Sequence, residues 1–505
     1  MKRLIKSLIW LDNNLIKLML GFFIFLIPLL PKLPIRLIDY TYIGLRYEDL
    51  YLALFFCVFL FQLMRKKIQL QTKFLPHFII FWVIVFISNF VATYYLKTTR
   101  IDQLGLLHSM RRFEYMIIFF IATATVKTKE DFFHYLRLVF ITLALVSLYG
   151  LGQKILGWPA VQTMNPEYAK GYLLTLDANA RISSTFAGHY DFAAYLVFLI
   201  PLTLGFFIST NQKSYFLCFV IALINLTLTA SRVSYIAYII SNLTFLIVVK
   251  KPKLLLAIAL LTICFTYLSG NLTKRLNRTF QEKKVFVNKI TGQTNVAQKI
   301  TVDDLPAGNI NSKNIVKKST AATMTQQDII ILKEQIQETL RKEGKKFASR
   351  QEELDYIDQM VKNYNVVSTV LPDISVATRL QVEWPRAIKA FLKYPLLGIG
   401  PSNLTEATDN DYLRLLGEFG ILGFLSFFYL IFAIVQYIFS AAVKMKKKYQ
   451  FLFYGCLFGI GALLINASYI DVFEASKVAY TFWMIMGIYV GVLTWNKIEL
   501  FYEKK

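Results

Sequence analysis

The chain has 505 residues, of which 56% are hydrophobic, 15% aromatic and only 17% charged, and its mean hydropathy is +0.48. So few charges cannot cover the surface of a soluble protein that holds 43 Phe and 29 Tyr residues, which excludes the soluble globular, disordered and fibrous classes. The net charge of +24 points to an anionic lipid or substrate, and in so apolar a chain we expect no nucleic acid partner. The composition predicts a membrane protein embedded in a lipid bilayer.

Apolar stretches long enough to cross about 30 Å of hydrocarbon recur along most of the chain. Because every backbone polar group inside lipid must be satisfied within its own segment, we expect these stretches to be helices. The fold class is therefore an all-α polytopic membrane protein. The expected spans are 15–31, 48–64, 75–95, 113–126, 133–152, 190–208, 214–230, 232–249, 253–269, 421–443, 451–470 and 477–495.

Clusters of Lys and Arg in short loops, such as Arg65 to Lys67 and Lys446 to Lys448, fall on the same side as both termini if there are twelve spans. Cytoplasmic loops are enriched in these residues, so both termini are expected in the cytoplasm and the protein in the plasma membrane. The expected division is residues 1–269 with nine spans, a large extracytoplasmic loop at 270–420, and residues 421–505 with three spans and a short tail.

The large loop is too long to be a simple connector. Residues 282–365 are interpreted as a variable insertion, and the polar stretch 282–325 within it as a flexible segment. From 326 to 364 the spacing of apolar residues predicts an amphipathic helix, which lies on the membrane, covers a site or acts as a solvated spacer. Residues 377–413 carry the motifs of the loop.

Three polar blocks lie on the predicted outer side. The first is RISSTFAGHYDFAAY at 181–195, the second is TASR at 229–232, and the third combines Trp384 with YPLLGIGP at 394–401 and DNDYL at 409–413. Taken alone, the Gly-rich part of the third block is equally well explained as a turn between two helices. The glycines at 417, 420 and 423 are expected to allow close helix approach where the chain re-enters the membrane.

In this order the three blocks resemble the O-antigen ligase and polymerase family, bacterial membrane proteins that join lipid-linked glycans. The resemblance implies an enzyme of the glycosyltransferase type. Its donor would be an undecaprenyl-diphosphate-linked glycan and its acceptor a hydroxyl of a glycan or lipid. It implies no cofactor and no metal, and the sequence offers no His/Cys spacing of a metal site.

Arginine suits a diphosphate because its planar fork makes bidentate, charge-assisted hydrogen bonds and keeps its charge. Arg181, Arg232 and Arg379 lie in or beside the matched blocks and are the predicted diphosphate ligands. Arg386 follows Arg379 by about two helical turns, so both can face the same way. Arg111 and Arg112, before the fourth span, are further outward candidates. For each of these arginines the alternative is a snorkelling anchor at the membrane edge.

The ligases of the family carry a His-Asn pair where this chain has Asp409 and Asn410. This departure favours a polymerase or a ligase-like transferase with another acceptor. Asp409 is the predicted catalytic base, although an Asp before a helix is equally an N-cap, and His189 is the alternative base. Asn410, Tyr190 and Asp191 are predicted to contact the substrate.

Two other classes compete with this hypothesis. A different lipid-linked-sugar glycosyltransferase would use carboxylates of the first outer loop, where Asp39, Glu48 and Asp49 lie. A multi-span transporter or flippase would place charged residues at mid-membrane, between repeated halves. The location of the buried charges distinguishes them, because an outer pocket favours transfer and a mid-bilayer pathway favours transport.

Overall fold

The computed structural model describes most of the chain and divides it into two compact units. The helical unit consists of Met1–Thr273 and Arg386–Lys505, and the insertion unit of Lys274–Pro385. Residues outside the description are 1, 38–43, 100–101, 162–172, 178–179, 278–279, 292–293, 297–319, 322–323, 343, 346, 373, 405–406 and 496–505.

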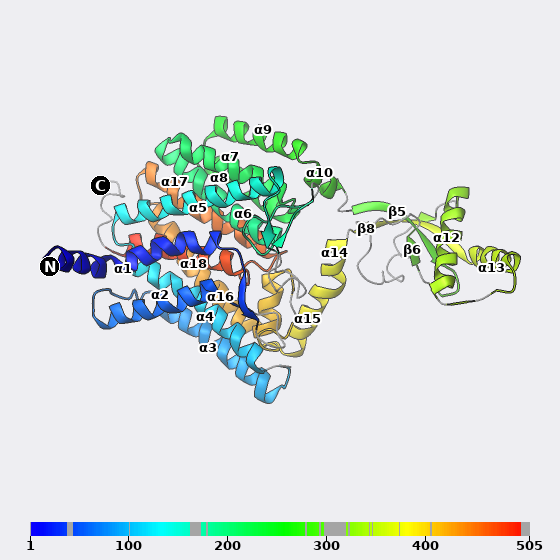
Figure 1. Ribbon diagram of the computed structural model, residues 1–505, viewed down its shortest axis with the longest axis horizontal. Coiled ribbons are helices and arrows are strands. Elements are labelled where there is room, and N and C mark those ends of the chain that lie inside the picture. Colours follow the sequence, from blue (N-terminus) through cyan, green and yellow to red (C-terminus); the bar gives the residue numbers. More distant parts are fainter. Residues whose placement is uncertain are drawn as a thin grey trace. The chain divides into compact units, whose positions relative to one another are not determined.

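Each of the twelve apolar stretches expected from the sequence contains a helix (Figure 1). Eight helices of the described residues are long and apolar enough to cross a membrane, which confirms the all-α polytopic membrane fold; the exact number of spans stays a prediction. The helices are α1 (Lys2–Leu29), α2 (Tyr47–Met64), α3 (Leu75–Phe90) with its π-helical extension η1 (Val91–Tyr95), α4 (Asp102–Thr125), α5 (Lys129–Ile155), α6 (His189–Thr210), α7 (Lys213–Leu228), α8 (Arg232–Val248), α9 (Pro252–Leu268), α16 (Asp411–Ala442), α17 (Lys447–Ala467) and α18 (Ser476–Thr494).

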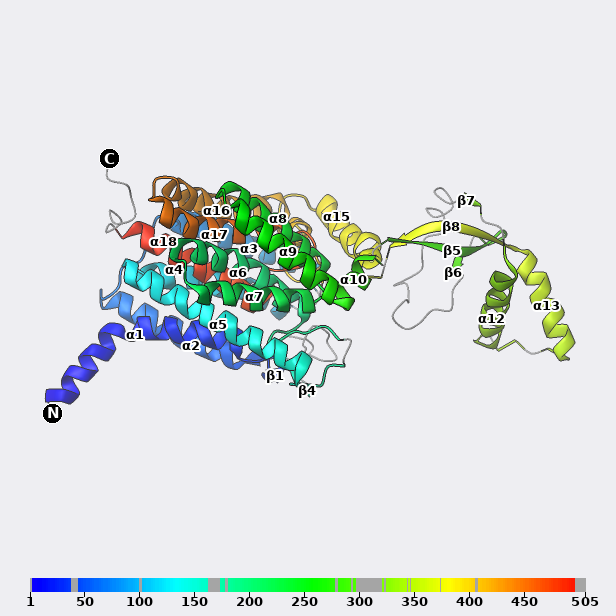
Figure 2. The same ribbon diagram turned by 90° about the horizontal axis from the view of Figure 1, so that it is seen from above.

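The helices lie side by side and run in alternating directions (Figure 2). We call distal the end of the helical unit at which α1 and α5 end and α6 and α18 begin. The basic clusters predicted to be cytoplasmic lie at the opposite end, where Arg65 donates to Asp12 at 2.7 Å and Lys17 to Asp131 at 2.7 Å. Short strand pairs occur in two distal loops: β1 (Pro34–Leu37) with β2 (Gly44–Arg46), and β3 (Ala160–Val161) with β4 (Leu173–Leu174).

α6 and α18 form the centre of the helical unit. In α6 89% of the most apolar 18-residue window is buried by protein, and in α18 94%. α6 packs mainly against α17, and α18 against α4. Helices enclosed in this way read as apolar on all faces, which explains why their sequences show almost no polar stripe.

α16 is broken at Gly420, whose backbone is not helical (φ 63°, ψ −165°). At this break the chain pairs with residues 395–400: Ile399 N–H donates to Gly417 O at 2.9 Å, and Ile421 N–H to Pro395 O at 2.8 Å. The Gly-rich stretch of the third block is thus hydrogen-bonded through its backbone to α16. The expectation that glycines allow close approach here is confirmed, since a Cβ on Gly420 would lie 2.3 Å from the Leu396 carbonyl carbon.

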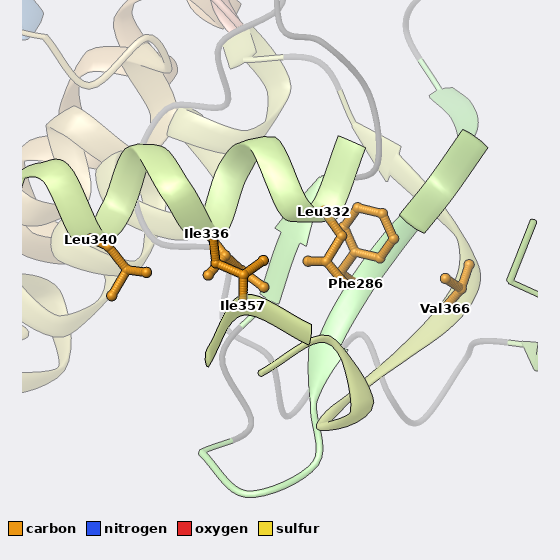
Figure 3. Packing of buried hydrophobic residues seen from close by; sticks show 6 residues of the cluster. All are labelled: Phe286, Leu332, Ile336, Leu340, Ile357 and Val366. Carbon is orange, nitrogen blue, oxygen red and sulfur yellow. The ribbon is translucent and has the colours of Figure 1, made fainter. Parts of the chain in front are cut away.

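The insertion unit contains a four-stranded sheet in the order β6-β5-β8-β7. Its centre is the antiparallel pair of β5 (Phe280–Asn288) and β8 (Tyr364–Pro372), flanked by β6 (Thr294–Val296) and β7 (Thr320–Ala321). Two helices, α12 (Gln326–Lys342) and α13 (Arg350–Lys362), pack on the sheet. Together they enclose a small core of Phe286, Leu332, Ile336, Leu340, Ile357 and Val366 (Figure 3).

This unit differs from the expectation in two respects. Residues 282–288 were expected to be flexible but belong to β5, because their partner strand lies far along the chain and gives no local signal. The amphipathic helix expected over 326–364 is two helices, and its apolar face packs on its own sheet instead of a membrane or a site. α10 (Gly270–Asn277) leads into the insertion unit. After β8 the unit continues through α14 (Ile374–Thr378) and the π-helical η3 (Arg379–Glu383), and α15 (Trp384–Lys393) leads back to the helical unit.

Candidate functional site

Residues 181–188, the start of the first predicted block, form a buried strap at the distal end. Gln153 of α5 holds the backbone of the strap: its Oε1 accepts from Ser183 N–H at 3.2 Å and Ser184 N–H at 2.8 Å, and its Nε2 donates to Ser184 O at 2.9 Å. Ser184 has a φ of 51°, a conformation that few residues other than glycine adopt. The polar side chains of this stretch therefore fix the shape of the strap.

Lys477, at the start of α18, ties the strap to α1. Its side chain is buried, and its ammonium lies 4.9 Å from the centre of the Phe186 ring. All three N–H donors of an ammonium are used in this position. The acceptors are the main-chain carbonyl oxygens of Pro28 at 3.0 Å, Leu30 at 2.7 Å and Thr185 at 2.7 Å.

Four of the predicted site residues meet where the strap enters α6. The rings of His189 and Tyr190 lie 4.1 Å apart, and the Arg181 guanidinium lies over the Tyr190 ring at 5.6 Å. Asp191, in the first turn of α6, has its Oδ2 4.0 Å from the Nζ of Lys32. The first block therefore presents a guanidinium, two rings and a carboxylate at one helix start.

Two carboxylates join the loop before α16 to the loop between α17 and α18, and we call Asp411 and Asp471 the carboxylate lock. Asp471 accepts from three consecutive N–H groups, those of Thr408 at 2.9 Å, Asp409 at 3.0 Å and Asn410 at 3.0 Å. In return, Asp411 accepts from the two N–H groups that follow Asp471, at 2.7 and 3.3 Å. Together these five hydrogen bonds fix the backbone on both sides of Asp409.

Asn410, not Asp409, is the N-cap of α16. The Asn410 side-chain oxygen accepts from Leu413 N–H at 3.0 Å, and its amide nitrogen donates to Ser468 O at 2.9 Å. Asp409 is half-buried, with a left-handed φ of 50° that Asp tolerates better than most residues. The capping role that competed with catalysis for Asp409 therefore belongs to its neighbour, and substrate binding by Asn410 stays a prediction.

Next to the lock lies an arginine–carboxylate cluster of buried charges. Arg112 of α4 donates to Glu418 at 2.7 Å and to Glu474 at 2.5 Å. Arg414 lies 3.1 Å from Asp471 and 3.6 Å from Glu418. Because buried charges are costly unless paired, these contacts hold α4, α16 and the loop after α17 in one arrangement.

A small cavity opens beside this cluster. Its polar lining comes from Arg112, Asp411, Arg414 and Glu474, and Trp483 is among its aromatic residues. The free space of about 20 Å³ accommodates a water molecule and is far too small for a sugar ring.

The strap and the carboxylate lock lie at the same end of the helical unit. Asp191 is close enough to Asp471 for their charges to interact, and Lys477 interacts electrostatically with Asp191 as well. The structure thus brings His189 and Asp191 from the first block towards the loop that carries Asp409. Among the described residues, the buried ion pairs with more than one partner gather at this end, not at mid-bundle.

The other predicted arginines are distributed differently. Arg232 begins α8 and is buried; beside it Ser234 donates to Asn466 at 3.1 Å, which links α8 to α17. Arg379 belongs to the insertion unit, where it is buried and donates to Ser375 O at 2.7 Å. A diphosphate site built from Arg181, Arg232 and Arg379 therefore stays a prediction.

Arg386 belongs to the helical unit, where it is exposed and donates to Leu404 O at 3.5 Å. The π-helical turn η3 begins at Arg379 and precedes α15, which carries Arg386. That Arg386 binds the diphosphate together with Arg379 stays a prediction.

Sequence reasoning missed several distal residues. Lys32, Asp471, Glu474 and Lys477 all contribute to the network at this end. The available signal was their position, because charged residues at the edge of an apolar span are rare and usually have a partner. Such a signal marks the residues without indicating which partner each one takes.

The carboxylates of the first outer loop do not show the freedom of a catalytic base. Arg111 holds Asp49 in a bidentate pair at 2.7 and 3.1 Å, and Asp49 also accepts from Arg46 N–H at 2.9 Å. Glu48 is buried and lies 3.8 Å from the Arg46 guanidinium. Asp39, the remaining candidate of this loop, lies outside the described residues.

Helices long and apolar enough to cross a membrane, with a buried polar network at one end, define a multi-pass membrane protein. Residues 217–428 match the family model described as O-antigen ligase, whereas a search of curated proteins found no match. Over these residues the chain is similar to the O-antigen ligase family. The match includes the second and third blocks and confirms the resemblance seen in the sequence, and the family indicates glycosyl transfer in a membrane.

Proposed function

We propose that the protein transfers a glycan from an undecaprenyl-diphosphate carrier to an acceptor hydroxyl at its distal end, on the extracytoplasmic side of the plasma membrane. Both termini then lie in the cytoplasm. The acceptor is a growing polysaccharide, another glycan or a lipid. The observation that supports this proposal is that Asp191 of the first block lies within electrostatic range of Asp471, which binds the backbone of Asp409, in a chain whose third block lies in the segment that matches the family model.

In this proposal the diphosphate is held by arginines and the acceptor by the groups near Asp409. Arg181 is the best-supported diphosphate ligand, because it lies at the start of α6; Arg232, Arg379 and Arg386 are further candidates. Asp409 or His189 takes the proton of the acceptor hydroxyl, while Tyr190, Asp191 and Asn410 contact the sugars. The diphosphate is already an activated leaving group, so positioning and proton removal are the main tasks of the protein.

The rivals receive less support. A transporter would need charged residues along a mid-membrane path, but the buried ion-pair cluster of the described residues lies at the distal end. Use of first-loop carboxylates is disfavoured by the arginine pairing of Asp49. Transfer therefore remains the function that the geometry favours.

The decisive experiment uses the full-length protein in lipid nanodiscs with an undecaprenyl-diphosphate glycan and a glycan acceptor. Product size distinguishes the two activities, because a polymerase gives a ladder and a ligase a single adduct. We expect Asp409→Asn to slow transfer by about 10²- to 10⁴-fold, the usual contribution of a general base, with its unfolding temperature unchanged. Asn410→Ala is the matched comparison and should instead destabilise the protein by about 1 kcal/mol through the lost N-cap. Full activity of Asp409→Asn would transfer the role to His189, and absence of any transfer product would refute the proposal.

A further inference from the structure

We propose that Lys32, together with the start of α6, forms a binding site for a phosphate group, and that this group belongs to the diphosphate of the lipid-linked donor. The identity of the donor rests on the proposed function, whereas the phosphate site does not. Lys32 lies outside the segment that matches the family and outside the set of arginines discussed above.

Lys32 follows the end of α1 and precedes β1, and only 6% of its surface is exposed. Its nearest carboxylate oxygen, Oδ2 of Asp191, is 4.0 Å from Nζ, which is beyond hydrogen-bonding distance. Among the residues that the structure describes, none accepts a hydrogen bond from this ammonium. A buried ammonium has three N–H donors to satisfy, and an anion with several acceptor oxygens can satisfy them.

Two neighbouring cations, unlike Lys32, have close hydrogen-bond or ion-pair partners. The donors of Lys477 are taken by three carbonyl oxygens, and Arg111 is held by the carboxylate of Asp49. Arg46 lies next to Lys32 because it pairs with Pro34 in the strand pair, and its guanidinium is 3.8 Å from the carboxylate of Glu48. Among these four described cations, Lys32 and Arg46 therefore have only distant ion-pair partners.

The start of α6 supplies the second component. Its N-cap is Gly188, which has an extended backbone and makes no side-chain capping bond. The N–H groups at a helix start, with the positive end of the helix dipole, favour phosphate. Lys32 lies beside this turn, since its ion-pair partner Asp191 is the third residue of α6. An ammonium at a helix start matches the several acceptor oxygens of a phosphate.

Protonation of Lys32 gives the site a characteristic pH dependence. Burial lowers the pKa of the Lys32 ammonium to about 8, and the positive charge of Arg46 acts in the same direction. Asp191 and Glu48 oppose this change, while Arg111 adds to it. The charge is therefore present below this pH and lost above it, so phosphate binding should weaken as the pH rises above about 8.

The test measures binding of farnesyl diphosphate to the full-length protein in zwitterionic nanodiscs. We expect Lys32→Gln to bind about tenfold more weakly, as for one lost hydrogen bond to a charged group, and Lys32→Arg to restore most of the affinity. Lys17→Gln is the matched control, because it removes a lysine at the opposite end and should leave binding unchanged. The binding of the native protein should fall above pH 8, and that of Lys32→Arg should not.

The effect of Asp191→Asn on diphosphate affinity distinguishes a phosphate site from a purely structural ion pair. Removing the carboxylate beside Lys32 should tighten diphosphate binding, whereas loss of a merely stabilising ion pair would weaken it. This variant also keeps the test valid if Lys32→Gln does not fold. Unchanged diphosphate affinity in both Lys32→Gln and Asp191→Asn would overturn the site.

The source of the phosphate is distinguished by a second arm with phosphatidylglycerol nanodiscs. If Lys32→Gln loses retained phosphatidylglycerol but binds farnesyl diphosphate normally, the site takes a lipid headgroup and its assignment to the donor is wrong. Binding requires no transfer. Lys32-dependent binding without any transfer product would therefore refute only the proposed function, and transfer with Lys32-independent binding would refute only this inference.

Discussion

Asp409 and Asn410 are adjacent in the sequence but have different tasks in the structure. The Asn410 side chain caps α16, and the backbone of both residues is held by Asp471. These hydrogen bonds fix the backbone on both sides of Asp409, and a fixed backbone is what the proposed catalytic carboxylate needs. If Asp409 is the base, the chain uses a carboxylate where the ligases of the family carry a histidine.

Asp328 offers a prediction on pH dependence in the insertion unit. Burial alone would raise the pKa of this carboxyl, but hydrogen bonds from Thr325 and Lys284 outweigh burial and lower it. A carboxyl with a lowered pKa in the folded state stabilises the fold above its unfolded pKa of 3.8, and this stabilisation is lost as the pH falls through the folded value. We therefore expect α12 to lose protection from hydrogen exchange below about pH 4, after correction for intrinsic exchange rates.

The control for this prediction is an exposed carboxylate of α13, Asp355. Asp328→Asn should cost about 1 kcal/mol because it weakens the reciprocal cap with Thr325, and should remove the acid dependence. Asp355→Asn should behave like the native chain. Equal protection of α12 in all three proteins at acidic pH would contradict the prediction.

Some site residues could be predicted from the sequence and others could not. Arg181, His189, Tyr190 and Asp191 form one continuous block, and a helix start brings such neighbours together without long-range information. The Asp471 contact to the Asp409 loop joins residues 62 positions apart, and no local pattern indicates that pairing. The same holds for the contact of Lys32 with Asp191.

At the scale of elements, α16 combines two tasks because it is broken at Gly420. The segment before the break carries Asp411, Arg414 and Glu418 into the polar network, and the segment after it is apolar. The positive φ at Gly420 and the pairing with residues 395–400 keep the two segments together. The break therefore separates the polar, site-bearing part of the helix from its lipid-facing part.

Gly420→Ala tests this element. The new Cβ would lie 2.3 Å from Leu396 C, in a backbone conformation that alanine rarely adopts, so we expect a loss of about 1–3 kcal/mol and reduced transfer. Gly461→Ala in α17 is the matched control, because a Cβ there meets no atom within 4 Å and alanine favours helix. Thermal unfolding of the detergent-purified proteins measures both. A Gly420→Ala protein as stable as Gly461→Ala would show that the break is not required.

Hydropathy predicted the helical elements because lipid imposes a length and a composition on each span. The spans expected at 214–230 and 232–249 correspond closely to α7 and α8, although only Thr229, Ala230 and Ser231 separate these helices. The strands β5 and β8 were not predicted, because no local property of the sequence indicates them. They pair across a long segment, and the lysines at 283 and 284 in β5 resemble a solvated loop.

At the scale of the whole molecule, the two units have separate cores. The core of the insertion unit comes from its own sheet and helices, and the helical unit is assembled from residues on both sides of the insertion. Stability of the membrane part should therefore not depend on most of the insertion.

Replacing residues 289–363 with a two-residue turn tests this independence. Asn288 and Tyr364 are paired at the ends of β5 and β8, so a two-residue Asn-Gly turn can join the strands as a hairpin. We expect the helical unit to keep its unfolding temperature, measured by tryptophan fluorescence, and the protein to retain transfer, since Arg379 and Asp409 remain. Aggregation or a large drop in unfolding temperature would show that the insertion supports the membrane part.

The pairing of Phe280 with Pro372 has a consequence for the history of this chain. The insertion leaves and rejoins the loop at neighbouring points, so its replacement by another domain requires no movement of the membrane helices. Recombination can therefore exchange this segment between relatives while the distal network is inherited unchanged.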